Sequence, residues 1–161
     1  MRVTAQEEYG LRCIMQVARS GPQGYSTIPE MAERECLTSA YVGKLMRVLR
    51  KAKLVKSIRG PKGGFQLIRP PDQISVGEVL AALGGRLYST EFCDRYRGKR
   101  RECVHSIDCS LRSLWVGVER LVEGVLGQCR LSDLDCSEEA MSSWIGGRVR
   151  VERGVAGCPE A

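Results

Sequence analysis

The stretch Leu54-Val-Lys-Ser-Ile-Arg-Gly-Pro-Lys-Gly-Gly-Phe-Gln-Leu-Ile68 decides the fold. Its two ends, residues 54–58 and 65–68, are rich in apolar residues and predict two short strands. The glycines between them permit positive φ values, and Arg59 and Lys62 place positive charge at the tip. A nucleotide-binding phosphate loop does not fit, because no Gly-Lys-Ser/Thr follows and no helix begins there. We therefore predict a β-hairpin with a basic, glycine-rich tip.

Three helices are predicted before this hairpin, over residues 4–19, 27–35 and 38–52. The first two begin with a Thr that stands three residues before a Glu, which predicts a capping box, and Ser75 with Glu78 predicts another after the hairpin. A short helix, a tight turn and a helix with a basic polar face form a helix-turn-helix arrangement, and the hairpin behind it would be a wing. An ordinary solvated helix could show the same basic face, but the hairpin favours a winged helix-turn-helix.

The composition fits one globular domain with an additional arm. Of the 161 residues, 43% are hydrophobic and 27% are charged. A net charge of +6, from 25 Lys and Arg against 19 Asp and Glu, favours a polyanionic partner such as DNA. Aromatic residues make up only 6%, which argues against stacking on single strands. The chain shows no apolar signal core and no bilayer-length apolar run, so we expect a cytoplasmic protein without a membrane partner.

Three cysteines and the only histidine lie within seventeen residues, at Cys93, Cys103, His105 and Cys109. Five of the residues between the first two cysteines are Arg or Lys, and nearby positive charge favours the thiolate form that binds metals. Soft ligands grouped in a polar loop indicate a metal or iron–sulfur site. The alternative is a basic loop whose cysteines are spare thiols or disulfide partners.

A long helical pattern follows over residues 111–129. Its apolar stripe needs a partner surface and contains Leu111, Leu114, Val118, Leu121 and Val125. We expect the same helix of a second subunit to cover it, because winged DNA-binding domains usually act as symmetric pairs on two half-sites. The alternative is that the stripe packs back onto its own domain.

Residues 136–161 show little periodicity, and we expect a mobile tail with at most a short helix near Trp144 and Ile145. Cys13 and Cys36 fall near apolar helix positions and are predicted to be core residues. The remaining cysteines are interpreted as structural or incidental: Cys129, Cys136 and Cys158.

The predicted fold class is mainly α. It combines a winged helix-turn-helix domain that carries a small β-hairpin wing with a long C-terminal dimerisation helix. The predicted units are the DNA-binding domain (1–85), the cysteine loop (86–110), the dimerisation helix (111–135) and the tail (136–161).

Several stretches carry a resemblance to a known family: Met1-Arg-Val-Thr, Tyr9-Gly-Leu-Arg, Ile58-Arg-Gly-Pro-Lys-Gly-Gly-Phe-Gln-Leu67, Ile74-Ser-Val-Gly-Glu-Val79 and the three-cysteine loop. Through these stretches, the chain resembles the iron–sulfur-cluster regulator (IscR) family of winged-helix repressors, which includes nitric-oxide sensors. The resemblance covers residues 1–135. The wing sequence is the most specific part of the match, and the tail has no clear counterpart.

The resemblance implies a homodimer that binds a palindromic operator in double-stranded DNA. It implies that Cys93, Cys103 and Cys109 are thiolate ligands of an iron–sulfur cluster. Three cysteines with one oxygen or nitrogen ligand can hold either 2Fe–2S or 4Fe–4S, and we prefer 2Fe–2S. The residues that it assigns to DNA contact are Ser39, Ala40, Tyr41, Lys44 and Arg47 in the major groove, and Arg59, Gly60, Pro61, Lys62 and Gly63 at the wing.

The chain departs from the family in the spacing of its cysteines and in the fourth ligand. Nine residues separate Cys93 from Cys103, whereas the family often spaces its cysteines evenly. Arg112 stands where members of the IscR type place a histidine. In the nitric-oxide-sensor branch an acidic residue of the first helix, from the other subunit, completes the site, and Glu8 matches that position. We prefer Glu8 as the fourth ligand, with His105 as the alternative.

The sequence thus predicts a DNA-binding transcriptional regulator, a repressor whose operator affinity is set by a cluster that senses redox state, nitric oxide or iron supply. A first alternative keeps DNA binding but uses the cysteines as a thiol or disulfide switch, or to hold zinc. A second alternative is a small iron–sulfur redox protein. We expect no enzyme, because the chain lacks a Cys-x-x-Cys pair, a nucleotide loop and a paired His and carboxylate near a nucleophile.

Overall fold

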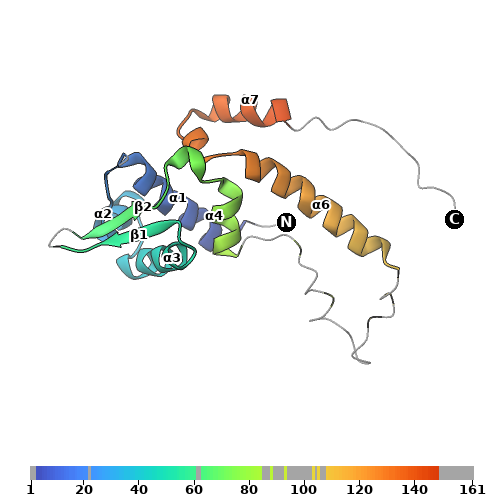
Figure 1. Ribbon diagram of the computed structural model, residues 1–161, viewed down its shortest axis with the longest axis horizontal. Coiled ribbons are helices and arrows are strands. Elements are labelled where there is room, and N and C mark those ends of the chain that lie inside the picture. The colour runs from blue at the N-terminus through green and yellow to red at the C-terminus, as the bar shows by residue number, and fades with distance from the viewer. Residues whose placement is uncertain are drawn as a thin grey trace.

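The computed structural model describes residues 3–21, 23–60, 63–84, 88, 93, 103, 105 and 108–148. Figure 1 shows α1 to α4 and the hairpin gathered in one body, from which α6 runs outward. The elements are α1 (Ala5–Arg19), α2 (Ile28–Arg34), α3 (Ser39–Lys51), β1 (Val55–Ile58), β2 (Gly64–Leu67), η1 (Pro71–Gln73), α4 (Val76–Leu83), α6 (Ser110–Gln128), η2 (Leu131–Leu134) and α7 (Glu138–Arg148).

The helices of the DNA-binding body begin at the predicted caps. Thr4, Thr27 and Ser75 each accept a hydrogen bond from the amide three residues later, and the Glu at that position accepts one from the cap's own amide. Thr38 caps α3 by accepting from the Tyr41 amide. The three capping boxes are therefore confirmed, and with them the starts of α1, α2 and α4.

The predicted wing is an antiparallel hairpin in which Val55 pairs with Leu67 and Ile58 pairs with Gly64. Ser26, from the segment between α1 and α2, pairs with Phe65 in an isolated bridge whose two N–H to O distances are 3.0 and 2.9 Å. A Cβ at Gly64 would lie 2.7 Å from the Ser26 carbonyl oxygen, so this close approach of two backbones requires glycine. The wing is thus anchored to the body at its β2 strand.

The core lies between α1, α3 and α4, and its largest fully buried side chains include Ile14, Leu45, Met46, Leu49 and Ile74. Cys13 is fully buried among them, as predicted. The prediction for Cys36 is wrong, because this residue is exposed and has a φ of 53°. The prediction assumes that the helical pattern of α2 continues to Cys36. The backbone is left-handed at Cys36, so the helix ends before this residue and its side chain lies in solvent.

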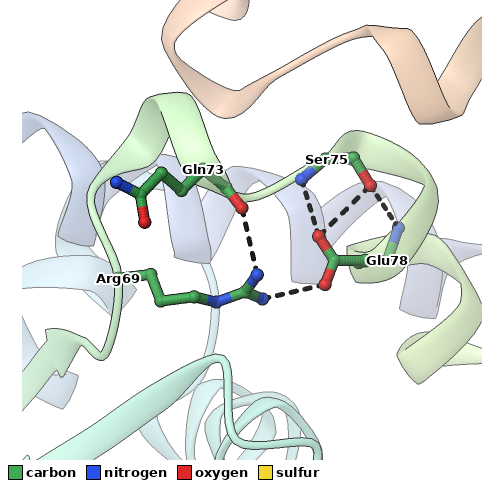
Figure 2. A network of polar contacts seen from close by, with 4 residues as sticks. All are labelled: Arg69, Gln73, Ser75 and Glu78. Atoms are coloured by element: carbon green, nitrogen blue, oxygen red, sulfur yellow. Dashed lines mark hydrogen bonds and ion pairs between the residues drawn. The ribbon is translucent and has the colours of Figure 1, made fainter.

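Arg69 connects the end of the wing to the start of α4 (Figure 2). Its guanidinium donates to the Gln73 carbonyl at 3.0 Å and to Glu78 Oε1 at 2.8 Å. Glu78 Oε2 accepts from the Ser75 amide at 3.0 Å. The Ser75 amide and then the Arg69 guanidinium hold the pKa of Glu78 below its usual value. One carboxylate therefore fixes both the α4 cap and the chain that leaves the wing.

Helix α6 contacts the body through its C-terminal end. The Cys129 carbonyl, just after α6, accepts from the Val76 amide at 2.8 Å, and a Cβ at Gly77 would lie 3.3 Å from the Gly127 nitrogen. In Figure 1 the rest of α6 extends away from α4. The apolar side chains that remain largely exposed on α6 are Leu111, Leu114, Trp115 and Leu121.

A helix, α7, occupies Glu138–Arg148, so regular structure in the tail exceeds the short helix expected near Trp144 and Ile145. Ser137 accepts from the Ala140 amide at its start, and the Arg148 guanidinium lies 3.9 Å from the centre of the Trp144 ring near its end. The helix is stabilised by these local contacts and by two acidic residues in its first turn. It has no clear apolar periodicity, which is why the sequence pattern did not predict its full length. Among the described residues, none of the helices combines the length and apolar character needed to cross a membrane.

Candidate nucleic-acid interface and cysteine site

Helix α3 has a buried face and a basic outer face. Val42, Leu45, Met46 and Leu49 are fully buried, and this apolar face holds α3 against α1 and α4. Its first turn contains no acidic residue. The predicted DNA-contact residues lie on the other face, where Tyr41 is half-buried and the rest are exposed: Ser39, Ala40, Lys44 and Arg47. The arrangement leaves a positively charged surface free for the acidic groove of a duplex.

The wing presents its predicted residues to solvent as far as the structure describes them. Arg59, Gly60 and Gly63 are exposed, and the Gly63 amide donates to the Gly60 carbonyl at 2.9 Å. Gly60 has a φ of 142°, which a residue with a side chain rarely adopts, so the tight tip depends on glycine. The prediction for Pro61 and Lys62 falls outside the described residues.

Two aromatic rings join α1 to the start of α3. The Tyr9 and Tyr41 rings meet edge to face, with centroids 6.2 Å apart and an interplanar angle of 83°. The Arg12 guanidinium lies 5.7 Å from the Tyr9 centroid and forms an ion pair with Glu8 at 2.7 Å. Glu8 is thus linked to a predicted DNA-contact residue through two side chains, a link between distant positions that sequence reasoning missed.

Cys109 is the N-cap of α6, and its sulfur accepts from the Arg112 amide at 3.4 Å. This N–H···S contact holds the Cys109 sulfur at the N-terminus of α6. Arg112 also donates to the His105 carbonyl at 3.0 Å, which fastens this residue to the first turn of α6. Cys109, a predicted ligand, and the start of α6 therefore form one local unit.

Tyr88 lies beside Cys93, one of the predicted ligands. Its hydroxyl is 3.3 Å from Cys93 Sγ, and its amide donates to Glu119 Oε2 at 3.0 Å. The hydrogen bond to Cys93 is the main cause of a raised Tyr88 pKa. Tyr88 therefore joins the predicted ligand Cys93 to Glu119 of α6.

Within the described part of the chain, no three or more His, Cys, Asp and Glu side chains converge as metal ligands. Cys93, Cys103 and Cys109 are half-buried free thiols, and His105 is exposed. Glu8 is a half-exposed residue of α1 and faces an open groove of about 340 Å³ that Gln16 and Glu35 also line. By donor chemistry, three half-buried thiols fit an iron–sulfur cluster.

Comparisons with known proteins identify the family to which the winged-helix fold of this chain belongs. The Rrf2 family pattern, described as "Iron-dependent Transcriptional regulator", matches residues 3–136. The transcriptional regulator IscR of Sodalis glossinidius is 32% identical over 141 residues, which cover 88% of this chain and 82% of that protein. The structure of CymR, the global cysteine regulator of B. subtilis, has a TM-score of 0.66 at 28% identity, covering 83% of this chain and 95% of that one. The structure of T. potens IscR has a TM-score of 0.64 at 29% identity, and the match covers 88% of this chain and 96% of that one.

These matches confirm the predicted winged-helix fold class and the predicted class of DNA-binding transcriptional regulator. The relatives are named regulators and not enzymes, in line with the prediction that the chain is no enzyme. On the extent of the family match and the shared fold, this chain belongs to the Rrf2 family of transcriptional regulators.

Proposed function

We propose that the protein is a homodimeric repressor whose operator affinity is controlled by an iron–sulfur cluster. Cys93, Cys103 and Cys109 would hold the cluster, and Glu8 of the second protomer would complete it, with His105 as the alternative. A 2Fe–2S cluster is preferred over 4Fe–4S, and when bound it supplies a centre that responds to redox state, nitric oxide or iron supply. The observation that carries the proposal is the position of Cys109, because a sulfur ligand that caps α6 ties the loop to the proposed dimer helix.

The exposed stripe of α6 supports the homodimer. Leu114 and Leu121 are 55% and 73% exposed, whereas a monomer of this size rarely leaves such a row of apolar side chains uncovered. Two copies that pair along α6 would present two α3 helices to one duplex. Successive major grooves on one face of DNA lie about 34 Å apart, so the spacing between the two helices sets the affinity for a palindromic operator.

In this proposal, α3 and the wing contact the DNA. The segment Ser39–Lys44 together with Arg47 would enter the major groove, and Arg59 with the wing tip would reach the neighbouring minor groove. The exposed, acid-free outer face of α3 supports this assignment.

Residues of α1 could transmit a change at the cluster site to the DNA-contacting helix α3. Arg12 binds Glu8 and also lies over Tyr9, whose ring packs on Tyr41. A change in what the Glu8 carboxylate binds alters the position of Arg12 and, through Tyr9, the first turn of α3. The signal would thus pass as a shift between two populated arrangements.

The direct test is purification without oxygen, followed by visible absorption, iron and sulfide analysis, and operator affinity with and without the cluster at one salt concentration. We expect coloured protein, loss of the colour in Cys109→Ser, and retention of it in the matched control Cys136→Ser, because Cys136 lies outside the loop. Comparing the spectra of Glu8→Ala and His105→Ala identifies the fourth ligand. Colourless, iron-free protein or equal affinities in the two states would contradict the proposal.

The second candidate is a regulator without a cluster that senses thiol oxidation. It is favoured by the similarity to the cysteine regulator CymR and by the exposed thiols of Cys36 and Cys136. In that case anaerobic protein is colourless, and its DNA affinity changes with a thiol reductant alone. Metal analysis separates a third form, in which the same cysteines hold zinc, from the bare thiol switch.

A further inference from the structure

Gln16 is a polar residue of α1 that is 9% exposed, between the buried Met15 and Val17. Its side-chain amide nitrogen donates to Glu35, and its side-chain oxygen accepts from the Arg34 guanidinium at 3.2 Å. Arg34 ends α2, and Glu35 caps it. A single buried amide therefore fastens α1 to the end of the first helix of the helix-turn-helix.

The main-chain carbonyl of Gln16 makes a second set of contacts. It accepts from the hydroxyls of Ser20 and Ser26, each at 3.1 Å, and these two hydroxyls lie 2.7 Å apart. Ser26 is the residue whose backbone pairs with Phe65 of the wing strand β2. The carbonyl thus holds the segment that anchors the wing, while the side chain holds the turn before α3.

We propose that Gln16 is a positioning residue that fixes α3 and the wing relative to each other. The chain passes from Glu35 through Cys36, which has a positive φ, and Leu37 to Thr38, the cap of α3. A shift at Glu35 therefore moves the first turn of α3. The two DNA-contacting elements must enter neighbouring grooves together, so their relative position sets how well specific DNA is bound. This inference rests on the proposed assignment of DNA contact to α3 and the wing.

The first test exchanges the hydrogen-bonding partners. Gln16→Glu places a carboxylate against the Glu35 carboxylate, and the double variant Gln16→Glu with Glu35→Gln restores one donor and one acceptor while Arg34 keeps its acceptor. Affinity is measured at fixed salt for a duplex selected from a random pool by the unaltered protein, and for a scrambled duplex. We expect Gln16→Glu to weaken binding of the selected duplex about tenfold, the effect of losing the contacts at one base pair, because a displaced α3 no longer meets the base edges. The affinity for the scrambled duplex should change less than about twofold.

The second test addresses the wing arm. Ser26→Ala removes one hydroxyl from the Gln16 carbonyl, and Thr27→Ser is the control that leaves this contact in place. We expect Ser26→Ala to weaken binding of both duplexes and to reduce the dependence of affinity on salt, because the basic wing tip would also neutralise phosphates that flank the minor groove. Thermal unfolding of each variant reports its stability separately from its affinity.

Recovery of selective binding by the double variant, from a Gln16→Glu protein that folds but binds weakly, confirms the positioning role. If Gln16→Glu alone does not fold, the affinities of the folded Ser26→Ala variant and its Thr27→Ser control decide instead, and equal affinities in these two overturn the proposal. A double variant that folds but stays as weak as Gln16→Glu overturns the proposal, as does a Gln16→Glu protein with lower stability and unchanged affinities. All variants are compared in the same metal state. A cluster that proves absent, or without effect on affinity, defeats the proposed sensing function and leaves this comparison intact.

Discussion

The exposed stripe of α6 gives a quantitative prediction for the proposed dimer. Leu114 and Leu121 are 55% and 73% exposed in the single chain. Full burial of a leucine contributes about 2 kcal/mol, so covering both residues in both protomers contributes about 5 kcal/mol to association. The double variant Leu114→Glu with Leu121→Glu loses this contribution and adds buried charge. We expect its dissociation constant to rise by about three orders of magnitude or more.

The matched control changes the residue immediately before each leucine, in the double variant Ser113→Glu with Arg120→Glu. One position along a helix turns the side chain by about 100°, which takes these residues off the apolar stripe. The control makes the net charge more negative than the stripe variant does, so simple charge repulsion would affect it more. We expect the control to remain as dimeric as the unaltered protein.

Sedimentation velocity over a dilution series measures the association, and circular dichroism verifies that both variants keep their helix content. A stripe variant that dissociates no more readily than the control refutes the reasoning. The stripe would then be covered within its own chain, and the spacing of two α3 helices could not depend on α6.

Further predictions concern single residues. In reduced protein, a thiol alkylating reagent should modify the exposed Cys36 and Cys136 quickly and leave Cys13 unmodified, because burial, with a smaller effect of Glu35, raises the pKa of Cys13 to about 11. Peptide mass spectrometry after timed labelling measures this, and fast labelling of Cys13 would show that the core opens readily. The pKa of Glu78 is lowered by the Ser75 amide and by Arg69, so its stabilising effect is complete above the unfolded value of about 4.3 and is lost as the pH falls through the folded value. Glu78→Gln, which keeps the cap but not the charge, should therefore flatten the acid side of a stability-against-pH curve. Glu78→Ala should cost about 1 kcal/mol more at neutral pH, and thermal unfolding that ranks the two variants equally would contradict this account.

Much of the fold could be predicted because its signals are local. The cap at Thr4 and its partner Glu7 are three residues apart, and so are Ser75 and Glu78, so the sequence alone identifies where the helices begin. The hairpin around Gly60 is equally local. The outer face of α3 follows from the helical period once its buried residues are known, which is why the predicted DNA-contact positions share one surface.

The candidate site was predictable only as a set of residue types. The cysteines and histidine of residues 93–109 stand out by their spacing, but nothing in a linear sequence pairs Tyr88 with Cys93 through its hydroxyl or Tyr9 with Tyr41 through its ring. For Cys36, the sequence pattern led to a wrong prediction. A helical pattern extended by two residues placed it in the core, whereas a left-handed turn exposes it.

The sequence by itself determined the order of the elements, the caps that start them and the apolar faces of α1, α3 and α6, because hydrogen bonds and side-chain periods act over three or four residues. The tertiary structure decided which faces meet. It alone placed Gln16 against Glu35, nineteen residues away, and left the α6 stripe uncovered beyond the end that rests on α4. Such contacts depend on the path of the whole chain, which no short-range pattern contains.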